Sequence, residues 1–126
     1  MKKAILLFIV LVSFESCDKQ LKCLDLKNGT FELTSETGTT IIERKGDTQI
    51  EKKDGLNYYS DVEWINDCSY RLTNHRNQNG ELEKAELNSV YTIEILEVMK
   101  NSIRIKTSAN YSENILERKL RIIKIE

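Results

Sequence analysis

The segment from Asp61 to Leu72 limits what this chain can fold into more than any other part of it. It reads Asp-Val-Glu-Trp-Ile-Asn-Asp-Cys-Ser-Tyr-Arg-Leu, with polar and apolar residues alternating on both sides of an Asn-Asp pair. Alternation of period 2 is typical of strands with one buried face, and Asn-Asp favours a turn. The segment therefore predicts a hairpin whose apolar face carries Val62, Trp64, Cys68, Tyr70 and Leu72.

The same pattern extends over residues 29–126, which contain no proline. Strands are expected at 29–34, 39–44, 48–53, 56–65, 68–73, 89–98, 103–107 and 115–125, while 81–87 shows only a weak helical pattern. About eight strands joined by short turns predict an all-β fold, a single antiparallel up-and-down meander that forms a small closed or partly open barrel. Leu96 and the Ile122-Ile123 pair break the alternation, which predicts a β-bulge at each.

The N-terminus predicts export. Two lysines precede an apolar run from Ala4 to Val12, which is too short for a transmembrane helix of roughly 20 residues, and Ser16 precedes Cys17. Residues 1–16 are therefore expected to be a signal peptide. Cys17 resembles the lipid-accepting cysteine of bacterial lipoproteins, which implies a membrane anchor at the bacterial cell envelope, a tether over 17–28 and a β domain over 29–126. Ordinary signal peptidase cleavage without lipid is the alternative.

Two cysteines remain for the folded domain, Cys23 and Cys68. In an oxidising compartment such a pair is most simply a disulfide, which here would connect the tether to the central hairpin. Two free, buried thiols are the alternative. A zinc site is disfavoured because neither cysteine lies in a C-x-x-C pair.

No arrangement of residues indicates catalysis, a cofactor or a metal. His75 is the only histidine, and it lies in an Asn-rich stretch that predicts an exposed loop. Phosphate-binding loops, nucleophile elbows and zinc-protease motifs are absent from the sequence. A formal net charge of −1 does not favour nucleic-acid binding. We therefore expect a non-enzymatic protein with no cofactor.

Five residues are candidates for binding. Tyr58, Trp64 and Tyr70 are expected to lie in the core or to line a ligand cavity, because an eight-stranded barrel is either filled by side chains or holds one small ligand. Tyr59 has the opposite parity to Tyr58 and, together with Gly55 in the preceding turn, is a candidate for an exposed contact surface.

The first 72 residues resemble a group of small bacterial lipoproteins of unassigned activity. The shared features are a lipidated cysteine, a second cysteine before a Gly-Thr-Phe strand, and the W-x-x-D-C-x-Y-x-L segment that begins at Trp64. The chain is also similar in plan to lipocalin-like proteins and to membrane-bound lysozyme inhibitors, whose Gly and Tyr match Gly55 and Tyr58. These resemblances imply a binding module for a small apolar ligand or, alternatively, a protein-interaction module such as a lysozyme inhibitor. The oligomeric state is left open.

Overall fold

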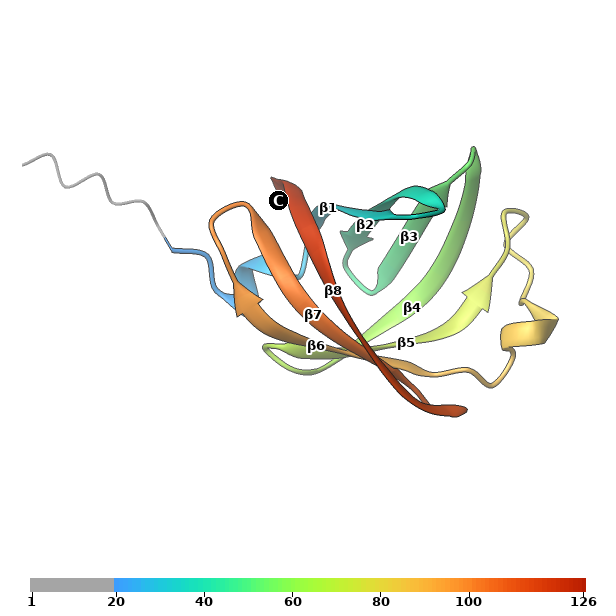
Figure 1. The fold of residues 1–126 in the computed structure, drawn as a ribbon. Coiled ribbons are helices and arrows are strands. Elements are labelled where there is room, and N and C mark those ends of the chain that lie inside the picture. Colours follow the sequence, from blue (N-terminus) through green and yellow to red (C-terminus); the bar gives the residue numbers. More distant parts are fainter. Residues whose placement is uncertain (1–19) are drawn as a thin grey trace, which may run out of the picture.

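Eight antiparallel strands follow one another around a closed barrel in the computed structural model, which describes residues 20–126 (Figure 1). The strands are β1 (Gly29–Ser35), β2 (Gly38–Lys45), β3 (Thr48–Lys53), β4 (Leu56–Asn66), β5 (Ser69–Arg76), β6 (Tyr91–Val98), β7 (Ser102–Ala109) and β8 (Ser112–Ile125). Each pairs with the next along the chain, and β8 closes onto β1. The predicted up-and-down barrel is confirmed. The predicted signal peptide and Cys17 lie outside the described residues.

Both predicted bulges are present. Ile95 pairs with Ile105 and Glu97 with Arg104, so that Leu96 is an extra residue in β6. In β8, Thr30 of β1 pairs with Lys124 and Phe31 with Ile122, which leaves Ile123 without an opposite residue. An extra residue bends its strand and increases the local twist, and both effects help a sheet to close.

Inward-facing apolar side chains from all but one strand form the core. The buried apolar residues are Leu26, Phe31, Ile42, Val62, Tyr70, Leu72, Ile93, Ile95, Ile103, Ile105 and Leu120. The strand that contributes none is β3, where Gln49 is buried and Ile50 pairs with Tyr59 on the opposite parity. The wall of the barrel is therefore not uniformly apolar.

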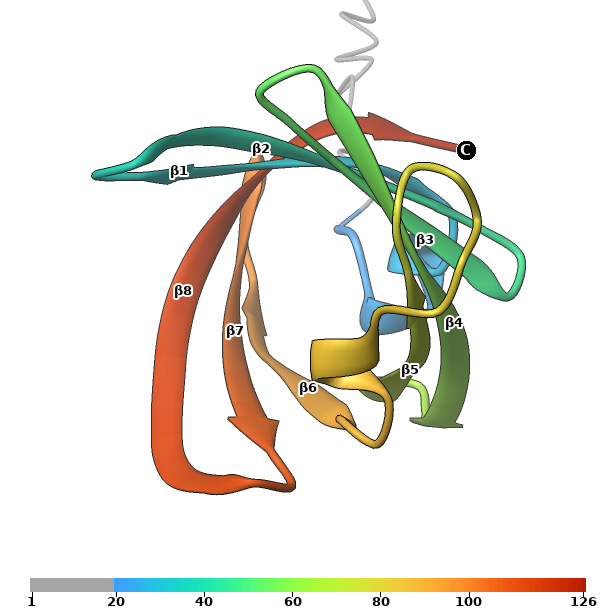
Figure 2. The same cartoon turned by 90° about the vertical axis from the view of Figure 1, so that its right-hand side faces the viewer.

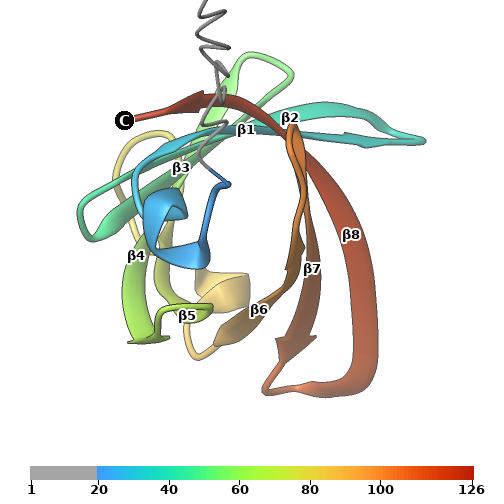
Figure 3. The same cartoon turned by 90° about the vertical axis from the view of Figure 1, so that its left-hand side faces the viewer.

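A short 3₁₀-helix, η1 (Cys23–Leu26), lies across one end of the barrel (Figures 1 and 3). Leu26 has 0% of its surface exposed and belongs to the core. Residues 23–26, which belong to the expected tether, thus form a helical turn that packs against the core. Leu26 and Cys23 are apolar enough to pack into the barrel, and they close this end.

The opposite end is bordered by four connections, of which that between β5 and β6 is the longest. It carries the single-turn η2 (Lys84–Glu86), which lies in front of the barrel opening in Figure 2. The weak helical pattern over residues 81–87 thus corresponds to this one short turn of helix. β5 also runs to Arg76, so the prediction of a loop from His75 is wrong. Asn74 has a φ of +50°, and the pairing between β4 and β5 is irregular at this point.

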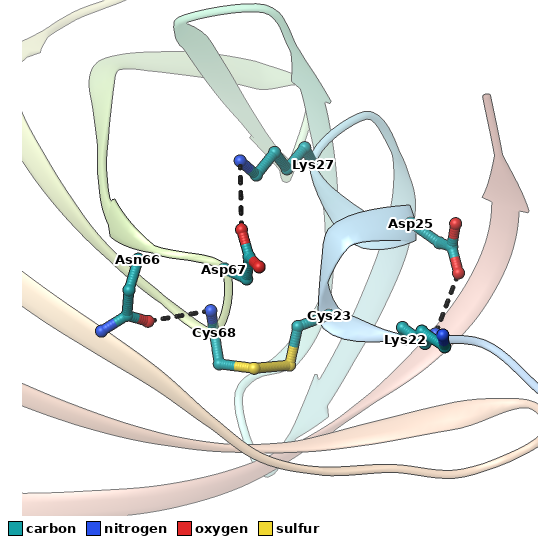
Figure 4. Close-up of a disulfide and its surroundings, with 7 residues drawn as sticks. All are labelled: Lys22, Cys23, Asp25, Lys27, Asn66, Asp67 and Cys68. Atoms are coloured by element: carbon teal, nitrogen blue, oxygen red, sulfur yellow. Dashed lines mark hydrogen bonds and ion pairs between the residues drawn. A yellow bond between two sulfur atoms is a disulfide. The ribbon is translucent and has the colours of Figure 1, made fainter.

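The predicted disulfide joins η1 to the turn between β4 and β5 (Figure 4). The Cα atoms of Cys23 and Cys68 are 5.1 Å apart. The Asn66 side chain accepts a hydrogen bond from the Cys68 backbone N–H at 2.9 Å, which is the turn chemistry expected of this residue. Lys27 lies 3.9 Å from the Asp67 carboxylate. The closed end is thus held to the central hairpin by a covalent bond and polar contacts.

Candidate ligand cavity

A cavity of about 440 Å³ occupies the interior of the barrel and reaches the end that carries η2. Its lining includes apolar residues of β1, β2 and β5 to β8, polar residues of β3 to β5, and Glu83 and Glu86 of the β5–β6 connection. Ligand sites in proteins typically measure 300–1,000 Å³ and combine apolar walls with a few polar groups. The cavity has the size and composition of such a site.

The apolar side of the cavity wall is formed mainly by β1, β2 and β5 to β8. Its aliphatic residues are Leu33, Ile42, Leu72, Ile93, Ile105, Leu116 and Leu120. Most of these side chains are buried, so they belong at once to the core and to the cavity wall. A ligand on this side would be held by burial of its own apolar surface, which contributes roughly 25 cal/mol per Å².

Beneath the cavity lies a buried guanidinium, that of Arg44, which is 1% exposed. Its Nη1 donates to Tyr70 Oη at 2.5 Å and to Gln49 Oε1 at 3.2 Å, and its Nη2 donates to the Leu26 carbonyl at 3.0 Å. Phe31 and Tyr70 also stack on it, with the guanidinium carbon 4.6 and 4.5 Å from their ring centroids. Three acceptors and two aromatic faces replace water around this charge. Arg44 thereby connects η1, β2, β3 and β5.

A second charged group, Glu51, lines the cavity and is connected to Arg44. Gln49 bridges the two, since its oxygen faces Arg44 and its Nε2 donates to Glu51 Oε1 at 3.2 Å. Burial raises the pKa of the Glu51 carboxyl, opposed by the hydrogen bond from Gln49 and the nearby His75. The folded state favours the protonated form of Glu51. Ionisation of this carboxyl therefore lowers the free energy of unfolding once the pH rises above the pKa that Glu51 has in the unfolded chain. At neutral pH, Glu51 therefore reduces stability, which is frequent for functional groups.

His75 lines the cavity and is half-buried, which corrects its prediction as an exposed loop residue. Its Nε2 lies 3.1 Å from the Ser89 carbonyl, which can only accept, so Nε2 carries a hydrogen. In the neutral ring Nδ1 then accepts from the Ser60 hydroxyl at 2.8 Å. The ring also packs edge-on against Tyr91. With both nitrogens engaged, His75 presents ring surface, and no free nitrogen, to the cavity.

Tyrosines surround the mouth. The Tyr91 hydroxyl donates to Glu86 Oε2 at 2.7 Å and lies 2.9 Å from the Tyr111 hydroxyl. Burial, together with these two hydrogen bonds, raises the pKa of Tyr91 above its usual value. The contacts hold η2 and the β7–β8 turn against the start of β6, so they shape the opening.

The predicted aromatic residues divide between the core and the cavity. Tyr70 is buried and forms part of the cavity wall, while Tyr58 lines the mouth and is 40% exposed. Trp64 does not line the cavity. It packs at the closed end, with its ring centroid 4.7 Å from that of Tyr70 and 5.7 Å from the Arg44 guanidinium. For Trp64, the core alternative is the one that the structure supports.

The predicted contact surface is only partly exposed. Gly55 lies in the β3–β4 turn with a φ of +77° and open space around it. Tyr59, expected to be exposed, is half-buried and borders the cavity. Its neighbour across the sheet is Arg76, whose guanidinium is paired with Asp61 at 2.9 Å. The hydrogen bond from Asn74 and that ion pair lower the pKa of Asp61.

Four important polar residues were missed in the sequence: Arg44, Gln49, Glu51 and Ser60. The alternation pattern could have identified two of them, Arg44 and Ser60. Arg44 lies on the same face of β2 as the buried Ile42, and Ser60 lies on the same face of β4 as the buried Val62. In β3 the only apolar residue faces outward, so the pattern there favoured the wrong face. Residues 20–126 contain no group of three or more His, Cys, Asp or Glu side chains placed to bind a metal ion.

No family model, curated protein or solved structure matches this chain. Its function must therefore be argued from the cavity itself.

Proposed function

We propose that this protein is a non-enzymatic binding module that holds a small, largely apolar ligand inside its barrel. The observation that carries the proposal is the cavity of about 440 Å³, which is closed at one end by η1 and bordered at the other by the four connections between strands. A well-packed core leaves few voids larger than a water molecule. An empty space of this size contributes nothing to the stability of so small a domain, so a bound ligand is the simplest explanation for it.

The exposed apolar side chains support the same proposal. Ten large apolar side chains are exposed among residues 20–126, and seven of them belong to the end of the barrel where the cavity opens: Leu56, Tyr58, Leu82, Leu87, Tyr111, Ile115 and Leu116. Several exposed apolar side chains at one end of a domain commonly mark a ligand or partner site. Around a cavity mouth, it would receive an apolar molecule before it enters.

Filling the cavity tests the proposal. Ile105→Phe replaces an aliphatic side chain of the cavity wall with a larger, aromatic one. We expect it to weaken binding of the neutral apolar probe N-phenyl-1-naphthylamine at least about tenfold, since the phenyl ring occupies part of the ligand's volume. The added ring enters empty space, so the midpoint of thermal unfolding should not fall. The measurement is a fluorescence titration of the protein purified after export from the full-length gene.

Ile123→Phe is the matched control. It makes the same substitution at an exposed position of β8 that does not line the cavity, and it should bind the probe as the wild type does. Equal probe affinity in the two variants would place the probe elsewhere and would contradict the proposed function. Native mass spectrometry of the exported wild-type protein should also show an adduct that denaturation removes.

We also propose that the barrel is attached to an envelope membrane through lipid on Cys17. The disulfide supports an oxidising, exported location, since such bonds persist there. Cys17→Ser is expected to move the protein from the membrane fraction to the soluble fraction, because no acyl chains would remain to insert. Immunoblotting of the two fractions measures this. Unchanged membrane retention of the variant would refute anchoring by Cys17.

A further inference from the structure

We infer that the cavity selects amphipathic ligands with a cationic amine head, which the Glu51 carboxylate and the face of Tyr58 hold while the apolar part lies against the opposite wall. The inference rests on the proposed function, since it names the ligand class of the same cavity. It is carried by the arrangement of charges and aromatic rings around Glu51.

Glu51 has one carboxylate oxygen available. Its Oε1 accepts from Gln49, and no group among residues 20–126 donates to Oε2. Glu51 lines the cavity, so this oxygen belongs to a group that a ligand can reach. A carboxylate in a mainly apolar site is a strong anchor for a cation, because a charge-assisted hydrogen bond in low dielectric exceeds a neutral one.

An aromatic side chain lies next to this carboxylate. Tyr58 is directly opposite Glu51 across β3 and β4, at the spacing where cross-strand side chains touch. Tyr59, Tyr70 and Tyr91 also line the cavity. Tyrosine faces attract ammonium groups through the ring quadrupole, and a carboxylate combined with several tyrosines suits an organic cation.

The charges of the lining favour a cation as well. Glu51, Glu83 and Glu86 line the cavity, against Arg76 and Arg118. Arg76 is already paired with Asp61, so the guanidinium groups that offset the three carboxylates are Arg118 in the lining and Arg44 buried beneath the cavity. The carboxylates therefore remain in excess around the cavity.

For an anionic head group, the cation of the lining that forms no ion pair among residues 20–126 is Arg118, which is exposed, so solvent and salt screen its charge. Arg44 does not line the cavity; its two terminal nitrogens donate to Gln49, Tyr70 and the Leu26 carbonyl, and its Nε, which has no hydrogen-bond partner among the described residues, is buried. Gln49 in turn directs its amide N–H toward Glu51. A carboxylate ligand would meet the Glu51 oxygen before it met the guanidinium.

The test compares three molecules that differ only in their head groups: n-decylamine, 1-decanol and decanoic acid. Each is titrated below its aggregation concentration, at pH 7, against the exported protein loaded with N-phenyl-1-naphthylamine. We expect the amine to displace the probe at a concentration at least about tenfold lower than the alcohol or the acid, the gain typical of a hydrogen bond to a charged group.

Two variants assign that preference to a residue. Glu51→Gln keeps the shape and removes the charge, so the amine should fall to the affinity of the alcohol while the alcohol is unchanged. Its unfolding midpoint at pH 7 should equal or exceed that of the wild type, because a buried carboxylate is removed. Glu94→Gln makes the same change on an exposed residue of β6 outside the cavity and should keep the amine preference.

The outcomes separate the inference from the proposed function. If the wild type binds the alcohol or the acid as tightly as the amine, or if Glu51→Gln keeps the amine preference, the inference is overturned and the cavity remains a binding site. If none of the three displaces the probe and Ile105→Phe does not weaken probe binding, the proposed function itself fails. The wild-type order of affinities decides the inference even without a folded variant.

Discussion

Replacing both Cys23 and Cys68 by alanine is expected to lower the free energy of unfolding by about 4 kcal/mol. The two residues are separated by 45 positions, and closing a loop of that length in the unfolded chain removes conformational entropy of about this size. Small domains are stable by only about 5–15 kcal/mol, so the loss is a large part of the total. The measurement is urea unfolding at pH 7, monitored by circular dichroism.

The reducing agent dithiothreitol provides the control for this prediction. Reduced wild type should unfold near the urea concentration of the double variant, whereas the variant should not respond to the reductant. The loss should also appear locally, because Leu26 is held in the core next to this bond. Hydrogen exchange of the amides in η1 should therefore accelerate more than that of β7. If the double variant had the same unfolding midpoint as the oxidised wild type, the disulfide would contribute nothing to stability.

Much of this fold follows from alternation and turn chemistry. The hairpin of β4 and β5 is clear in the sequence because a half-buried strand must alternate and the Asn66-Asp67 pair favours a turn. The breaks in alternation at Leu96 and at Ile122-Ile123 were equally informative, since an extra residue is the simplest way to keep both flanks of a strand on the correct face. Where the apolar pattern is strong, the sequence predicts even the irregularities.

The cavity was less predictable because its polar side does not follow that pattern. Gln49 and Glu51 face inward while Ile50 pairs with Tyr59 on the other face. Such an arrangement is stable only because Arg44, Gln49 and Glu51 form hydrogen bonds with one another, and residues from different strands come together only in the fold. A residue-by-residue pattern contains no information on such partners. The same reason explains why the half-buried position of His75 was not predicted: its two hydrogen-bond partners, Ser60 and the Ser89 carbonyl, come from other parts of the chain.

Whether the barrel would be hollow could not be predicted either. An eight-stranded barrel lies near the size at which its own side chains fill it. Here Trp64, the largest side chain of the hairpin, packs at the closed end against Arg44 and Tyr70, so its volume does not fill the other half. Leu26 of η1 adds to the same closed end. The uneven distribution of large side chains along the barrel axis is what leaves the open half empty.

Arg44→Ala is expected to reduce the free energy of unfolding by about 3–5 kcal/mol, the range for breaking a buried charge network. The substitution leaves Tyr70 Oη, Gln49 Oε1 and the Leu26 carbonyl without their donor and opens a void between Phe31 and Tyr70. Arg44→Lys should give an intermediate loss, since one ammonium cannot reproduce the planar fork that reaches three acceptors. Urea unfolding of each variant at pH 7 measures the effect.

The matched control is Arg104→Ala, on β7. Arg104 forms ion pairs with Glu97 at 3.5 Å and Glu117 at 3.4 Å, but all three side chains are at least 42% exposed. Exposed ion pairs typically contribute 0–1 kcal/mol, so this variant should lose about 1 kcal/mol or less. Similar losses for the two alanine variants would mean that the buried network is worth no more than a surface ion pair. A large loss at Arg44 alone would instead establish that one guanidinium joins η1, β3 and β5, and so holds in place the closed end on which the cavity is built.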